Sequence, residues 1–416
     1  MNLYQIIGKW AFSASFLGKR MCFLTGPRQI GKTTLSLLHL KSLRQEKNYY
    51  NWDTLGVKKL YAENSLFFLE NLPEIPPPPA PNLMPKYWIV FDEFHKHPNW
   101  KNLLKGYYDE FGHFLRFVVC GSARLDLFRL TGESLLGRYF LFKMFPLGPR
   151  DITEGGNFSL KHCWYPENTL NITLPSSDFK EAVETLFRLS GFPEPFLMGR
   201  AEFYNRWKEE HISLLTTEEI RDLSKISDLV RLQTLVFLLP ERVGAPVSLN
   251  KLAHILECAY NTVKTWIEAL EKVYLFFRIS PFMGKISRSL KKEKKLYFWD
   301  WGILSEGGKR FENFIAVQLI RTLSAWNEWG WGRFGLYYVR TKEGKEVDFL
   351  VVKNGKPFML IETKLSEVNL DPSLLYFKKR LNAPYAFQVI YHPDFLKQVT
   401  PGIFVIDASR FLYLLA

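Results

Sequence analysis

Short apolar runs and amphipathic segments alternate along the first third of the chain. Apolar runs that end in glycine or in a carboxylate predict buried strands, and leucines at helical spacing predict a helix at residues 32–43. Strands that alternate with helices indicate a mostly parallel sheet covered on both faces. The pattern therefore predicts an α/β domain at 1–150, with strands in four segments: 19–26, 49–53, 87–93 and 114–122.

Beyond this domain the apolar positions keep a helical period. Residues 178–239 predict amphipathic helices, and the proline-containing segment GFPEP interrupts them. Two helical stretches in 248–274, followed by the apolar LFFRI, are typical of a helix-turn-helix with a wing. The last part predicts a helix and then strands. We therefore expect a helical connector or lid, a winged-helix-like module and a C-terminal α/β domain, at 151–245, 246–283 and 284–416.

Composition narrows the class of protein. The 416 residues are 47% hydrophobic and 23% charged, which is typical of a globular chain of two to three domains. A net charge of +13 favours a polyanionic partner, nucleic acid before a membrane surface. The four cysteines lie far apart, no apolar run reaches the roughly 20 residues of a membrane span, and the N-terminus lacks the features of a signal peptide. These observations predict a cytoplasmic protein without a membrane partner.

One loop has the residue pattern of a phosphate-binding site. The segment GPRQIGKT fits G-x-x-x-x-G-K-[ST] between a predicted strand and a predicted helix. Its glycines allow backbone N–H groups to converge on phosphate oxygens, and the helix N-terminus adds a positive dipole. We expect Lys32 to contact the β- and γ-phosphates and the Thr33 hydroxyl to bind Mg²⁺. The predicted ATP-binding residues are Gly26, Pro27, Arg28, Gln29, Ile30, Gly31, Lys32, Thr33 and Thr34.

Two carboxylates close the apolar strand at 88–91. We expect Asp92 to hold Mg²⁺ and the adjacent Glu93, as a catalytic residue, to polarise the attacking water. Ser122 ends the next predicted strand at the same edge, where a polar side chain can sense the γ-phosphate. Arg138 is a candidate transition-state arginine, either within its own chain or donated to a neighbouring subunit; an ordinary surface arginine is the alternative.

The C-terminal strands contain a second set of charged residues. Asp348 lies on one apolar strand, and Glu362 and Lys364 share one face of the next. This is the pattern of metal-dependent nucleases, in which the two carboxylates bind Mg²⁺ and the lysine orients or activates water. Glu312 lies on the apolar stripe of its predicted helix, where a buried carboxylate needs a metal, a lysine or a hydrogen-bond partner. Two structural strands with exposed charges are the alternative.

The spacing of these carboxylates sets a condition on the second site. Residues paired across a two-residue turn at Asn354-Gly355 are an odd number of positions apart, whereas Asp348 and Glu362 are an even number apart. A regular hairpin of this kind would therefore place the two carboxylates on opposite faces of the sheet. We expect a three-residue connection or a β-bulge if the site is real.

Taken together, the motifs resemble those of prokaryotic AAA-like ATPases with a C-terminal domain of unknown function that has a restriction-endonuclease-like core. The resemblance covers nearly the whole chain, in order, and rests on GPRQIGKTTL, IVFDE, VVCGSARL, SLLGRYFLFKMFPLGPRDI, GFPEP, KLYFWDWG, RFENFIAVQL, GKEVDFLVV and LIETKL. Members often have a glutamine after the acidic pair, where this chain has Phe94-His95. The resemblance implies ATP and Mg²⁺ at the phosphate loop with Asp92 and Glu93, and a nuclease-like quartet of Glu312, Asp348, Glu362 and Lys364.

Two features bear on the expected nucleic-acid partner. The second helix of the winged-helix candidate exposes two lysines and two glutamates, a balance that is poor for phosphate contact and equally consistent with protein packing. The segment 285–295, KISRSLKKEKK, has six basic residues against one acidic residue. It is a candidate DNA contact, with a solvated loop as the alternative.

Two hypotheses follow from the sequence. The first is a Mg²⁺-dependent ATPase that acts on DNA, alone or as an oligomer, and whose nucleotide state reorients a nuclease-like C-terminal domain. The second is a nucleotide-switched protein-interaction module with a catalytically silent nuclease-like fold. Metal binding through Asp348 and Glu362 separates them, because a nuclease needs it and an interaction module does not.

Overall fold

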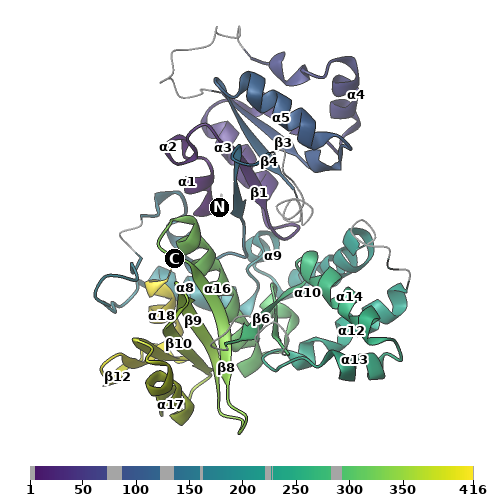
Figure 1. Ribbon diagram of the computed structural model, residues 1–416. Helices are drawn as coiled ribbons and strands as arrows, with labels where there is room; N and C mark the ends of the chain where they lie inside the picture. Colours follow the sequence, from purple (N-terminus) through teal and green to yellow (C-terminus); the bar gives the residue numbers. More distant parts are fainter. Residues whose placement is uncertain are drawn as a thin grey trace. The chain divides into compact units, whose positions relative to one another are not determined.

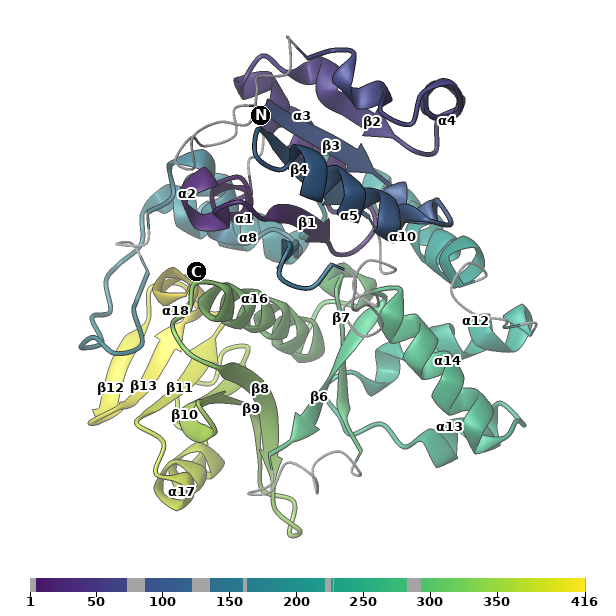
Figure 2. The same cartoon turned by 45° about the horizontal axis from the view of Figure 1, so that its top comes forward.

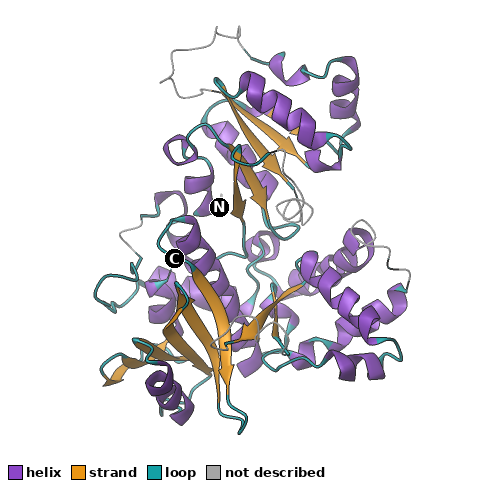
Figure 3. Ribbon diagram, viewed as in Figure 1, coloured by secondary structure: helices purple, strands orange, loops and turns teal. Residues whose placement is uncertain are grey.

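The computed structural model describes residues 5–72, 87–121, 135–159, 163–220, 226, 228–282 and 293–415 (Figure 1). In this described part the chain forms two compact units, Met1–Phe145 and Pro146–Ala416. The boundary lies close to the expected domain end at residue 150, and the finer division of the second unit stays a prediction. Figure 3 distinguishes the helices from the strands in both units.

The first unit contains a parallel sheet. Five strands of its described residues pair in the order β2-β3-β4-β1-β5, and each pairing is parallel. β4 therefore lies between the strand that precedes the phosphate loop and the strand that ends at Asp92. The predicted strands form where expected, and the structure adds β5. Their bounds are β1 Met21–Thr25, β2 Tyr49–Asn51, β3 Tyr87–Asp92, β4 Leu115–Cys120 and β5 Tyr139–Lys143.

Helices α3 and α5 cover opposite faces of this sheet (Figures 1 and 2). On the α5 side, Phe91 and Phe117 of the strands are fully buried in a cluster with Leu104 and Tyr107 of that helix. The helices of the first unit are α1 Ile7–Ala11, α2 Ala14–Leu17, α3 Lys32–Ser42, α4 Leu55–Glu63 and α5 Trp100–Phe111.

The second unit begins with helices. In α14 the buried side chains Val263, Trp266, Ile267 and Leu270 follow helical spacing, as the sequence pattern predicted. The helices that precede the large sheet are α7 Pro149–Thr153, α8 Ser177–Arg188, α9 Pro193–Met198, α10 Ala201–Leu214, α12 Leu229–Leu238, α13 Leu249–Ile255 and α14 Tyr260–Lys272. A π-helical turn, Leu215–Glu219, extends α10.

Among the described residues of the second unit, eight strands form one sheet in the order β12-β13-β11-β10-β9-β8-β6-β7. β6, the expected wing, pairs with β7 and with β8, so the expected boundary at 283/284 falls between strands of this sheet. The strands are β6 Phe276–Pro281, β7 Lys295–Phe298, β8 Phe334–Arg340, β9 Glu346–Lys353, β10 Lys356–Lys364, β11 Tyr385–Ile390, β12 Leu396–Thr400 and β13 Ile403–Asp407. The accompanying helices are α16 Gly308–Glu328, α17 Pro372–Leu381 and α18 Ala408–Leu414.

The β9–β10 hairpin shows how Asp348 and Glu362 come together. Its turn is the two-residue Asn354-Gly355, with φ of 51° and 81°, and Lys353 pairs with Lys356. The register then shifts between Pro357 and Met359, which is the β-bulge that the spacing required. After the bulge Ile361 pairs with Phe349, so the next position places Glu362 opposite Asp348. The predicted bulge is confirmed.

A second bulge lies in β9 itself. Tyr337 of β8 pairs with Leu350, but Val339 pairs with Val347, so Asp348 and Phe349 together face one residue of β8. Bulges re-aim side chains and are frequent beside functional sites. Here one bulge aligns Glu362 with Asp348, and the other contains Asp348.

Candidate functional site

The phosphate loop connects β1 to α3. Gly26 has a φ of 142°, and a Cβ on this residue would lie 2.3 Å from the backbone oxygen of Met144. Gly31, the residue before α3, has a φ of 95°. Both positions require glycine because side chains rarely adopt these angles. The buried Lys32 ammonium donates to the carbonyl oxygens of Gly26 at 3.1 Å and Pro27 at 2.7 Å, so it lies inside the curve of the loop.

Thr33 and Asp92 meet beside this loop. The Thr33 hydroxyl donates to Asp92 Oδ2 at 2.6 Å, because the carboxyl ends of parallel strands β1 and β3 lie at the same edge of the sheet. The hydroxyl of Tyr49 donates to the same oxygen at 2.7 Å. Burial and the Asp92 charge raise the pKa of Tyr49, so it stays a donor. Sequence reasoning missed Tyr49, because a strand pattern does not reveal which strands are neighbours.

Glu93 follows Asp92 in a left-handed backbone conformation, with a φ of 55°. Its side chain is within 3.1 Å of the Lys96 ammonium, which also contacts Asp53 at 2.6 Å. Burial raises the pKa of Glu93, and the charge of Lys96 opposes this effect. The candidate base is therefore held by an ion pair that the sequence did not reveal. Lys96 lies in the turn that follows Glu93, and Asp53, the second partner of Lys96, lies in the loop after β2.

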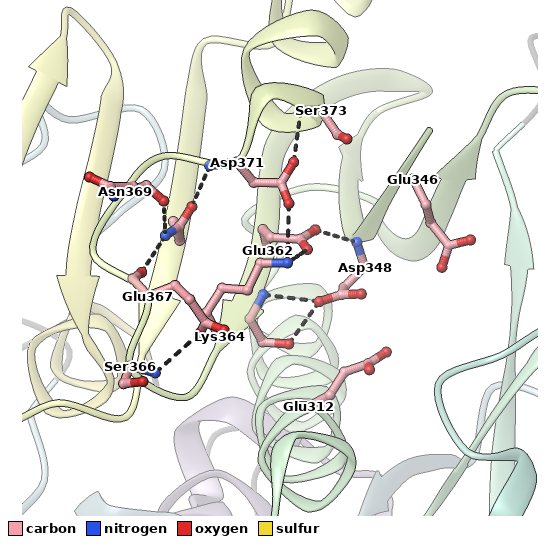
Figure 4. Close-up of polar contacts among 12 residues, drawn as sticks. Glu312, Glu346, Asp348, Glu362, Lys364, Ser366, Glu367, Asn369, Asp371 and Ser373 are labelled. Atoms are coloured by element: carbon pink, nitrogen blue, oxygen red, sulfur yellow. Dashed lines mark hydrogen bonds and ion pairs between the residues drawn. The ribbon is translucent and has the colours of Figure 1, made fainter. Parts of the chain in front are cut away.

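The C-terminal site centres on the hairpin (Figure 4). Asp348 donates its backbone N–H to Glu362 Oε2 at 3.2 Å. Thr363 donates to Asp348 Oδ2 through its backbone N–H at 2.9 Å and its hydroxyl at 2.7 Å. The Lys364 ammonium lies 2.9 Å from Glu362 Oε1 and 3.1 Å from Asp371 Oδ2. Three members of the expected quartet, Asp348, Glu362 and Lys364, thus form one polar network.

Glu312, on α16, is connected to Asp348 through Lys295, which the sequence analysis assigned to a basic segment. The ammonium of Lys295, at the start of β7, lies 2.6 Å from Glu346, 3.4 Å from Glu312 and 3.4 Å from Asp348. The side chain of Lys295 is 1% exposed. The Tyr297 hydroxyl also donates to Glu312, at 2.7 Å. The partly buried carboxylate of Glu312 therefore has both a lysine and a hydrogen-bond partner, as its position on the apolar stripe of the helix predicted.

Burial and charge shift the protonation of this cluster. Burial and the neighbouring charge of Asp348 raise the pKa of Glu312 to about 7 and that of Glu362 to about 8. Burial alone would lower the pKa of Lys295, but the charges of Glu312, Asp348 and Glu346 outweigh it and raise this pKa. Lys295 is therefore a permanent cation in the physiological range, whereas Glu312 and Glu362 titrate within it.

Three family matches cover most of the chain. Residues 18–153 match the AAA domain family, residues 180–307 a domain of unknown function, DUF8612, and residues 307–407 a second domain of unknown function, DUF4143. The N-terminal part of the chain is an AAA-like P-loop ATPase domain. This match and the loop geometry agree with the first half of the predicted resemblance.

The chain is similar to proteins of bacteria and of archaea. The chain is 24% identical over 350 residues to the uncharacterized protein Rv2008c of Mycobacterium tuberculosis, covering 80% of this chain and 68% of that protein. It is 25% identical over 382 residues to the uncharacterized protein MJ1637 of Methanocaldococcus jannaschii, covering 86% and 76%.

Two solved structures show a loose likeness. The Walker-type ATPase PABY2304 of Pyrococcus abyssi has a TM-score of 0.35 and 16% identity, covering 68% of this chain and 89% of that one. The Aeropyrum pernix Orc1 protein in complex with DNA has a TM-score of 0.29 and 13% identity, covering 68% and 84%.

Arg138 and Ser122 were both expected to act at the nucleotide site. Arg138 precedes β5, and its carbonyl accepts from Met21 at the start of β1, whereas the phosphate loop follows the end of β1. Its guanidinium is held by Asp109 at 2.8 Å. These contacts lie at the opposite end of β1 from the phosphate loop, and the expected catalytic role of Arg138, within its own chain or in a neighbouring subunit, stays a prediction. Ser122 lies outside the described residues.

The expected DNA contact at 285–295 is changed by the position of Lys295. Residues 285–292 lie outside the described part of the chain. Lys295 is buried among carboxylates, so it cannot contact a nucleic-acid phosphate.

The two sites differ in their fit to a divalent cation. In the AAA domain a hydroxyl and a carboxylate, Thr33 and Asp92, lie side by side next to the phosphate loop, which suits Mg²⁺ bound with a nucleotide. In the second unit a buried ammonium already lies against Glu312 and Asp348. No group of three or more metal-ligating side chains occurs within the described ranges. As arranged, the second site does not fit Mg²⁺.

Proposed function

We propose that the chain is a Mg²⁺-dependent ATPase. The observation that carries this proposal is the 2.6 Å contact between Thr33 and Asp92, two residues 59 positions apart, beside a loop whose shape requires glycine. Mg²⁺ bound with ATP neutralises the charge that develops on the transferred phosphoryl group. Thr33 and Asp92 are the residues that would hold it.

The other residues of the site have separate roles. Amides of the loop and the N-terminus of α3 bind phosphate oxygens. Lys32 exchanges its bonds to the Gly26 and Pro27 carbonyls for bonds to phosphate. Glu93 accepts a proton from the attacking water. Because Glu93 pairs with Lys96, that ion pair must open or rearrange before Glu93 acts.

Two substitutions test this proposal. Lys32→Ala should weaken ATP binding by about 10- to 100-fold, the range for a charge-assisted hydrogen bond. Glu93→Gln should preserve binding and lower the turnover rate by about 100-fold or more. Lys41→Ala is the matched control, because Lys41 lies exposed on the same helix. Isothermal titration and phosphate-release assays measure both quantities, and unchanged binding and turnover in Lys32→Ala would contradict the proposal.

We also propose DNA as the partner on which the ATPase acts. The support is the net charge of +13, which attracts polyanions. No helix within the described ranges is long and apolar enough to cross a membrane. Stimulation of ATP turnover by DNA is the measurement that tests this partner.

A second candidate function is the nucleotide-switched interaction module. The burial of the Lys295 ammonium against Glu312 and Asp348 favours it, because a nuclease needs those oxygens for metal. In this function the second unit keeps a nuclease-like fold and binds a partner without cutting nucleic acid. Nicking of DNA or RNA that requires Asp348 would contradict it.

A further inference from the structure

Lys295 lies among three carboxylates of the second unit. Its Nζ atom contacts one oxygen of each of three carboxylates, from α16 and from β9, and lies 5.5 Å from the centre of the Tyr338 ring. The side chain is almost fully buried, so its charge depends on these carboxylates for solvation. A lysine in this position serves the electrostatic purpose that a metal ion serves in a carboxylate cluster.

The oxygens of the two predicted metal ligands already have donors. Asp348 Oδ1 is within 3.4 Å of Lys295, and Asp348 Oδ2 accepts from Thr363. Glu362 Oε1 is bound by Lys364, and Glu362 Oε2 accepts from the backbone of Asp348. Mg²⁺ needs oxygen ligands at about 2.1 Å in octahedral geometry, which this network does not offer. A divalent ion would have to displace both Lys295 and protein hydrogen bonds.

We propose that Lys295 is the resident cation of the C-terminal carboxylate cluster and that it excludes divalent metal. Removing its charge leaves Glu312, Glu346 and Asp348 close together without their shared counter-ion. Such a cluster is costly when buried, and a divalent cation then relieves the repulsion. Replacing Lys295 by a neutral side chain should therefore create a metal site that the natural chain lacks.

This inference is independent of ATP hydrolysis, because its measurement is metal binding by nucleotide-free, full-length protein. Mn²⁺ is the probe, and electron paramagnetic resonance measures the bound fraction in the natural chain, in Lys295→Met and in Lys294→Met. Lys294 is the matched control, since it is the adjacent lysine and is not buried. Asp348→Asn, alone and combined with Lys295→Met, subtracts Mn²⁺ bound elsewhere, including at Thr33 and Asp92.

We expect Lys295→Met to bind Mn²⁺ at least about tenfold more tightly than the natural chain and Lys294→Met to match the natural chain. The gain should disappear in the double variant with Asp348→Asn. Failure of folded Lys295→Met to gain affinity would overturn the proposal.

A second measurement does not require Lys295→Met to fold. Mn²⁺ should raise the unfolding temperature of the natural chain and of Asp348→Asn by the same amount. A larger rise in the natural chain would show metal at Asp348 while Lys295 is present, and would also overturn the proposal.

Discussion

Glu312 and Glu362 respond to pH in the opposite way to an ordinary ion-paired carboxylate. In the unfolded chain such groups titrate near 4.5, whereas in the folded chain the pKa values are raised to about 7 and about 8. The folded state therefore binds more protons than the unfolded state between these values. Stability is highest where both groups are protonated and falls as the pH rises through this window.

The expected result is a loss of unfolding free energy between pH 5 and pH 8, up to about 3 kcal/mol from Glu312. Chemical denaturation at a series of pH values measures it. Glu312→Gln keeps the size of the side chain and should reduce the slope, whereas Glu306→Gln, at an exposed position, should leave it unchanged. An unfolding free energy that rises with pH over this range in the natural chain would contradict the prediction, because it would show that the two carboxylates are ionised and stabilised by their partners.

At the scale of elements, local patterns predicted most of the strands and helices, including β1, α3 and β3. The phosphate loop and the bulge in β10 were also predictable, because both follow from spacing along a short stretch of chain. Contacts between distant elements were not predictable. Tyr49 contacts Asp92 because β2 lies beside β3, and no local pattern specifies that neighbour.

Lys295 shows why a charge run can mislead. It is the last residue of a basic segment, and its neighbours in sequence suggest an exposed loop. It also begins β7, in which Tyr297 follows two positions later. The two side chains therefore lie on the same face of the strand, and both contact Glu312. The spacing of two between Lys295 and Tyr297 therefore indicated a strand, but the basic composition of the segment favoured an exposed loop.

The bulge at Phe358 is testable by deletion. Removing this residue makes the separation of Asp348 and Glu362 odd, so a regular two-residue hairpin still places these carboxylates opposite each other, but the buried Phe358 side chain is lost. We expect the free energy of unfolding to fall by about 3 to 5 kcal/mol, the cost of removing a buried aromatic side chain. Phe358→Leu keeps the bulge and an apolar side chain and should cost only about 1 kcal/mol. Denaturation midpoints compare the two variants, and a deletion variant that fails to fold would show that the regular hairpin does not keep the pairing of Asp348 with Glu362.

At the scale of the whole molecule, an ATPase that acts on DNA must link its two ligands energetically. If ATP changes the affinity for DNA by some factor, DNA must change the affinity for ATP by the same factor, typically about 5- to 150-fold. DNA should also stimulate ATP turnover, and added salt should weaken the effect because phosphate contacts release counterions. This coupling distinguishes a DNA-dependent ATPase from a chain that binds polyanions only through its net charge.

The Glu93→Gln variant allows the measurement, because it should bind ATP without rapid hydrolysis. Fluorescence anisotropy gives DNA affinity with and without ATP, titration calorimetry gives ATP affinity with and without DNA, and both are taken at one salt concentration. Lys32→Ala should retain DNA binding and lose its dependence on ATP. A coupling factor of one, together with turnover that DNA does not change, would contradict a DNA-dependent ATPase and favour the protein-interaction function. The charge of the chain would then attract DNA without affecting the nucleotide site.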